Sequence, residues 1–150
     1  MSQSDPSAAL ARLRRLLHGI LLLGLVGTLT ELLLIGHDED PWQSIPLVVL
    51  GVAILTTLGI VVTHAAAPAA VTRVFQWTMA VMVLSGAMGS VLHYRANMEF
   101  KLEMDLSLSG VALFSSVLQA KAPPTLAPGS MALLGLLGLV CSFRLDAQTP

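Results

Sequence analysis

Four long apolar stretches dominate this 150-residue chain, and they limit its possible folds more than any other feature. The hydrocarbon core of a bilayer is ~30 Å thick and takes about 20 helical residues to cross. The stretches predict transmembrane helices at residues 16–35, 45–67, 69–94 and 128–143. Because a backbone in lipid must satisfy its own hydrogen bonds, each stretch is expected to be helical. The sequence therefore predicts an all-α integral membrane protein, an antiparallel bundle of four transmembrane helices.

The composition supports a lipid environment and argues against several classes of function. Charged residues make up 11% of the chain, whereas a soluble domain carries ~25%. So little charge cannot cover a soluble surface, and we expect a single membrane domain in contact with the lipid bilayer. The net charge of −1 and the lack of a basic patch argue against nucleic-acid binding. The single cysteine, Cys141, rules out a disulfide within the chain.

The positions of lysine and arginine predict the orientation in the membrane. Residues 1–12 are expected to be a flexible cytoplasmic tail, and three arginines lie next to the first span. Cytoplasmic segments are enriched in basic residues, and the first helix carries the most weight. This orientation puts five basic residues inside (Arg12, Arg14, Arg15, Arg73, Arg144) and three outside (Arg95, Lys101, Lys121). We therefore expect both termini in the cytoplasm, with a bacterial cytoplasmic membrane as the location.

The connection between the third and fourth spans is the longest, and its sequence predicts further helix. Residues 95–105 contain no glycine or proline. They place Arg95 with Glu99, and Lys101 with Asp105, at the i,i+4 spacing that stabilises helices. The third helix is expected to continue outside the membrane to about residue 105. A short amphipathic helix is expected over residues 109–121, at the outer membrane interface.

Small residues predict how the helices meet. Hydrophobicity does not drive helices together in lipid, so close approach through small residues must contribute much of the association. The predicted packing faces contain a pair of glycines on each of three spans: Gly24 and Gly27, Gly86 and Gly89, Gly135 and Gly138. Packing within the bundle is the favoured interpretation. Docking of these faces onto another protein's helix is the alternative.

Glu31 is the most informative polar residue, because a carboxylate at membrane depth is costly unless it is protonated, paired or facing water. It is expected on the packed face of the first helix, about one turn inside its outer end. His93 is expected at a comparable depth, so we predict that the two side chains meet, with Arg95 as the rival partner of Glu31. A plain buried polar contact is the simpler interpretation. A proton relay, or a metal or ligand site, is the alternative.

Other polar residues on the outer side suggest a metal or haem site. His37, Asp38, Asp40, His93 and Glu99 are of the types that bind divalent metals, although no recognised metal-binding spacing is present. A solvated acidic loop is the favoured interpretation of residues 37–40. The four histidines divide evenly between the two sides, which suggests bis-histidine haem ligation. Histidines at a membrane edge more often extend toward the headgroups.

The sequence contains no recognised catalytic motif, so we expect a protein without catalysis of its own. The leading hypothesis is an accessory or scaffold subunit that docks onto other subunits of a larger membrane protein complex. The acidic outer side would suit a basic extracytoplasmic partner. The first alternative is a redox bundle that binds haem, a metal or another cofactor. The second alternative is proton-coupled transport centred on Glu31.

Overall fold

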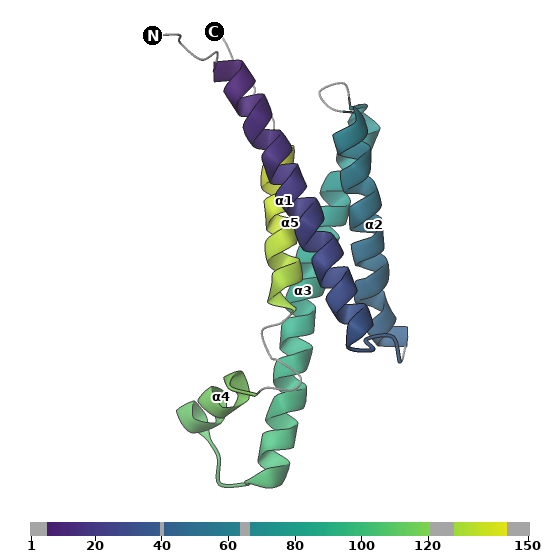
Figure 1. Cartoon of the computed structure of the whole chain (residues 1–150). Coiled ribbons are helices and arrows are strands. Elements are labelled where there is room, and N and C mark those ends of the chain that lie inside the picture. Colours follow the sequence, from purple (N-terminus) through teal and green to yellow (C-terminus); the bar gives the residue numbers. More distant parts are fainter. Residues whose placement is uncertain (1–5, 40, 64–66, 121–127, 144–150) are drawn as a thin grey trace.

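The computed structural model describes residues 6–39, 41–63, 67–120 and 128–143. Within these ranges the chain forms helices and no strand. Figure 1 shows them in chain order: α1 (Pro6–Leu34), α2 (Pro41–Thr63), α3 (Ala69–Met104), α4 (Gly110–Leu118) and α5 (Gly129–Ser142).

Two helices begin earlier in the chain than expected. Helix α1 starts at Pro6, so the prediction of a flexible tail is wrong for residues 6–12. Helix α2 starts at Pro41, with Ser44 and Pro46 inside it. Proline fits the first position of a helix because its missing N–H would have no partner there. Pro41 therefore begins α2 four residues before the expected start at residue 45.

Among the residues that the structure describes, three helices are long and apolar enough to cross a membrane: α1, α2 and α3. Helix α5 is also apolar but has 14 residues, which at 1.5 Å per residue span about 21 Å. That length is short of the ~30 Å hydrocarbon core. The described part of the chain is therefore all-helical, with three helices of membrane-spanning length and one shorter apolar helix, a pattern typical of a membrane protein.

The long helices run up and down beside one another, and α5 lies along α1 and α3 (Figure 1). The first half of α1 meets the end of α5, where Arg14 Nη2 donates a hydrogen bond of 3.0 Å to the carbonyl oxygen of Phe143. The last carbonyl groups of a helix have no partner within the helix, so a cation suits this position. We call this end of the bundle the Arg14 end, and the opposite end of α1 the His37 end.

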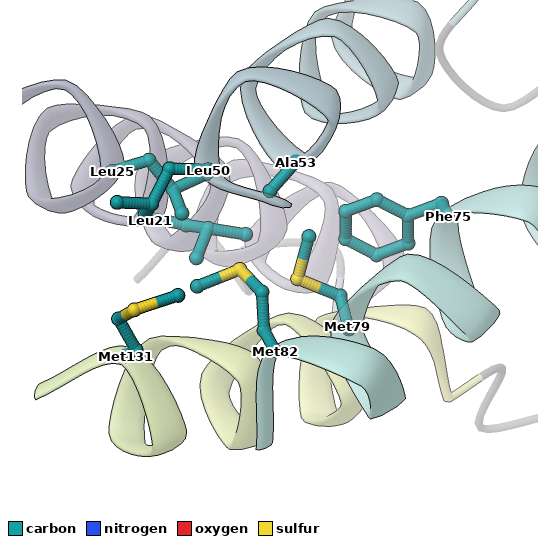
Figure 2. Packing of buried hydrophobic residues seen from close by; sticks show 8 residues of the cluster. All are labelled: Leu21, Leu25, Leu50, Ala53, Phe75, Met79, Met82 and Met131. Atoms are coloured by element: carbon teal, nitrogen blue, oxygen red, sulfur yellow. The ribbon is translucent and has the colours of Figure 1, made fainter. Parts of the chain in front are cut away.

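The core is a cluster of aliphatic, aromatic and sulfur-containing side chains from four helices. Figure 2 shows its eight residues: Leu21, Leu25, Leu50, Ala53, Phe75, Met79, Met82 and Met131. Three of them are methionines, whose flexible thioether chains fill irregular space. The cluster ties α5 to the other helices through Met131 (Figure 2).

Glycines allow α3 and α5 to approach at backbone distance. A Cβ atom added at Gly86 would lie 2.5 Å from the backbone nitrogen of Ala132, and one at Gly135 would lie 2.7 Å from the carbonyl oxygen of Met79. Added Cβ atoms at Gly24, Gly89 and Gly138 would also meet neighbouring side chains closer than 3 Å. Gly27 is different, because it is exposed with no atom within 4 Å of the added Cβ. The expectation that Gly27 lies on a packed face is therefore wrong.

Candidate functional site

The end of α1 forms a turn that directs the chain toward α3. His37 N–H donates to the carbonyl of Leu32 at 2.9 Å, and Gly36 N–H donates to the carbonyl of Leu33 at 3.2 Å. Gly36 has a φ of 68°, in the left-handed region that glycine adopts without a Cβ penalty. This pair of bonds is the Schellman motif, which satisfies the last carbonyl groups of a helix. The turn places His37 just past the end of α1.

His37 lies beside His93 of α3. Their ring centroids are 6.5 Å apart, with an angle of 59° between the planes. Both side chains are half-buried. The contact brings together two of the residues that the sequence suggested as metal or haem ligands. It also places the end of α1 level with His93 along α3.

Glu31 does not join this pair. Its side chain is exposed, and the described residues give its carboxylate no hydrogen bond or ion pair. The prediction that Glu31 lies on the packed face of α1 is therefore wrong, and its expected contact with His93 is not formed. Arg95 is exposed as well. An outward-facing Glu31 does not line a path between the helices, as a proton-coupled transporter would require.

The other suggested metal ligands do not converge on the histidine pair. Asp38 and Glu99 are exposed, and Asp40 lies outside the described residues. Among the residues that the structure describes, no group of three or more histidine, cysteine, aspartate or glutamate side chains could hold a metal ion. The described geometry therefore supplies two imidazoles and no complete ligand set.

Helix α3 continues well past the histidine pair. Residues 94–104 of α3 follow His93, and eleven residues extend a helix by about 16 Å. Helix α4 folds back against this extension, where the rings of Tyr94 and Phe114 lie 6.1 Å apart. Val117 of α4 and Asn97 of α3 are buried. We call residues 94–118 the arm.

A tight turn closes the arm between its two helices. One carboxylate oxygen of Asp105 accepts hydrogen bonds from the backbone N–H of Ser107 at 2.9 Å and from its hydroxyl at 2.6 Å. These hydrogen bonds favour the charged carboxylate and lower the pKa of Asp105. Gly110 then begins α4 with a φ of 53°. The turn reverses the chain within five residues, 105–109.

The tip of the arm exposes large apolar side chains. Phe100 and Met104, one turn apart on α3, are 55% and 71% exposed, while Leu106 and Val111 are 88% and 83% exposed. The sequence suggested that the apolar side of residues 109–121 rests on the membrane interface. It did not single out Leu106, which stands between an aspartate and a serine without any periodic pattern. We call Phe100, Met104, Leu106 and Val111 the tip residues.

His18 is a second polar residue whose position differs from the expectation for a histidine at a membrane edge. It is 9% exposed and packs on Phe75, with ring centroids 6.1 Å apart, so it does not extend toward headgroups. Its Nδ1 lies 2.8 Å from the carbonyl oxygen of Arg14, whereas its Nε2 is buried with no hydrogen-bond partner. A neutral ring with the proton on Nδ1 satisfies that contact and leaves the Nε2 lone pair free. Nε2 is an atom of the kind that binds a metal ion or a haem iron, but no second histidine lies beside it among the described residues.

Replacing His18 with leucine is expected to stabilise the protein by about 1 kcal/mol, because a buried polar atom without a partner is costly. Loss of the hydrogen bond between Nδ1 and the Arg14 carbonyl oxygen should cost little, because that oxygen belongs to the α1 backbone and accepts a hydrogen bond within the helix. Unfolding in mixed detergent micelles, followed by circular dichroism, measures the change. A loss of stability would show that Nε2 has a partner that supports the fold.

No protein-family model, curated protein or solved structure matches this chain.

Proposed function

We propose that this protein is an accessory subunit of a larger membrane protein complex and binds its partner through the arm. In this proposal the bundle crosses the membrane four times, with α5 as the fourth and shortest span. Both termini lie in the cytoplasm and the arm projects from the opposite face.

The exposed tip residues carry the proposal. Apolar side chains within the bilayer are covered by lipid, but the tip lies beyond the level at which α1 ends. Leu106 and Val111 are each more than four-fifths exposed. Large apolar side chains that gather on a water-exposed surface mark interaction sites more often than chance. Aromatic and methionine side chains such as Phe100 and Met104 are also enriched in protein interfaces.

Charge supports the orientation and indicates the kind of partner. The described arginines that precede His93 in the chain lie in the first half of α1 or near the start of α3 (Arg12, Arg14, Arg15, Arg73). This position suits a cytoplasmic face. The described residues at and beyond the His37 end include two basic side chains (Arg95, Lys101) and five acidic ones (Asp38, Glu39, Glu99, Glu103, Asp105). Their sum is −3, so a partner surface with basic residues around an apolar centre would be complementary.

The proposal is tested with a double variant of the tip, Leu106→Asp with Val111→Asp. We expect the amount of partner that co-purifies from native membranes in mild detergent to fall at least tenfold, because the central apolar contacts of an interface carry most of its binding energy. Quantitative mass spectrometry of the purified material measures the loss.

The matched control adds the same two charges without removing apolar side chains: Ser109→Asp with Gln119→Glu. Ser109 is exposed at the N-terminal cap of α4, and Gln119 is exposed just after its end. This control should retain the partner, and both variants should keep the helical content of the native protein. Purification of the native protein without any partner would contradict the proposal. Equal amounts of co-purified partner with the two double variants would contradict it as well.

A further inference from the structure

A groove runs between α2 and α3 on the outside of the bundle. It has a volume of about 360 Å³ and is lined by Val48, Val49 and Val52 of α2. On α3 it is lined mainly by Val74, Trp77 and Val81. Branching at Cβ restricts valine to few rotamers, so the walls of the groove hold their shape.

The groove contains no unsatisfied polar group that would call for a polar ligand. Thr78 also lines it, but its hydroxyl donates to the carbonyl oxygen of Val74 at 2.9 Å. The lining is otherwise valine and tryptophan. An apolar chain is therefore the chemistry that the groove accepts.

The lining favours a lipid chain over a transmembrane helix of another protein. Helix interfaces in membranes are enriched in small residues that allow backbones to approach. Of these small residues (Gly, Ala, Ser, Thr), Thr78 alone lines the groove, and the glycines of α3, Gly86 and Gly89, face α5 and the Pro128 that precedes it. A flexible acyl chain can follow a valine-lined groove that a helix backbone could not approach closely.

One exposed cation stands at the Arg14 end of the groove. Arg73 is exposed and precedes Trp77 by one turn on the same face of α3. Every acidic residue that the structure describes lies nearer the His37 end or on the arm: Glu31, Asp38, Glu39, Glu99, Glu103 and Asp105. Arg73 therefore has no described carboxylate partner at its own end. Arginine binds phosphate well because its planar guanidinium offers several N–H donors.

We propose that this groove binds an anionic phospholipid, with one acyl chain along the valines and Trp77 and the phosphate at Arg73. From Arg73 to Val81 the site extends eight residues along α3, or about 12 Å. A headgroup at Arg73 and a chain directed toward Val81 match the direction of a lipid in the leaflet at the Arg14 end.

Trp77 reports directly on the occupant. The chain contains two tryptophans, Trp42 and Trp77, so a Trp42→Phe background leaves a single fluorophore in the groove. The protein is reconstituted in phosphatidylcholine vesicles that contain an increasing fraction of phosphatidylglycerol or phosphatidylcholine with brominated chains. We expect half-maximal quenching at an about fivefold lower fraction of brominated phosphatidylglycerol, since one arginine near the surface contributes about that factor toward anionic lipid.

Three variants separate the parts of the proposal. Arg73→Gln should remove the preference for phosphatidylglycerol and leave quenching by brominated phosphatidylcholine unchanged. Arg12→Gln, an exposed arginine of α1 near the Arg14 end, should keep the preference. Val52→Phe, which fills the groove, should weaken quenching by both lipids.

Two results would overturn the proposal. Equal quenching by the two lipids would show that only the ordinary lipid annulus contacts Trp77, and a preference that persists in Arg73→Gln would place the anion elsewhere. Weak quenching by both lipids in the Trp42→Phe protein would show that protein, such as a second copy of the chain, covers the groove.

Discussion

Replacing Gly86 with leucine is expected to destabilise the protein by about 3 kcal/mol, the upper part of the usual range for overpacking. A Cβ atom at Gly86 would lie 2.5 Å from the backbone nitrogen of Ala132 and 2.7 Å from the carbonyl oxygen of Pro128. Both neighbours are backbone atoms, so no side-chain rotation can relieve the contact and α5 must move away from α3. Unfolding by sodium dodecyl sulfate in mixed micelles, followed by circular dichroism, measures the loss.

The same substitution at Gly27 is the matched control. Gly27 is exposed in the middle of α1, and a Cβ atom there meets no atom within 4 Å. Leucine has a higher helix propensity than glycine, by roughly 0.5–1 kcal/mol, so Gly27→Leu should leave stability unchanged or raise it slightly. Equal losses from the two substitutions would show that α3 and α5 do not pack through Gly86.

Replacing Phe75 with alanine is expected to cost about 2 kcal/mol. Phe75 is fully buried among the core residues of Figure 2, and it also packs against His18. In a soluble protein the change costs ~3–5 kcal/mol, part of which is the transfer of the ring into water. Lipid is as apolar as the core of this bundle, so the lost packing remains as the main cost. The same detergent titration measures it.

Phe100→Ala is the control for this change, because it removes the same side chain from a position that is 55% exposed. Its effect on unfolding of the isolated protein should be within about 0.5 kcal/mol, as for most surface substitutions. A Phe75→Ala protein as stable as the native one would contradict the described core, in which the ring fills space between α1, α2 and α3.

The local sequence pattern predicted the positions of the helices better than it predicted which helix faces contact one another. The third helix was expected to end at about residue 105 and ends at Met104. Its end could be predicted because residues 95–105 combine strong helix formers with favourable i,i+4 pairs. The start of α1 was missed by ten residues, since the expectation began the helix at the apolar stretch. Residues 6–15 mix alanine and leucine with a serine and three arginines, which makes them less apolar than the span, yet they contain no helix breaker after Pro6.

The faces that meet were harder to predict for a physical reason. Helices α1 and α2 are almost equally apolar on all sides, so their sequences contain no stripe that selects a buried face. Small residues were the remaining signal, and they indicated the contact of Gly86 with α5 and the contact of Gly135 with α3. On α1 the same signal was ambiguous: Gly24 meets Leu134, whereas Gly27 faces outward. Glu31, one turn beyond Gly27, was misplaced by the same error.

The sequence by itself determined that the chain is helical and suited to lipid, because long uncharged stretches must satisfy their backbone hydrogen bonds internally. Only the tertiary structure decided which polar groups are buried. It buries His18 against Phe75, turns Glu31 outward and brings His37 to His93. These placements depend on the rotation of each helix about its axis. That rotation is set by the close packing of α3 on α5 and by the core side chains, which lie far apart in the chain.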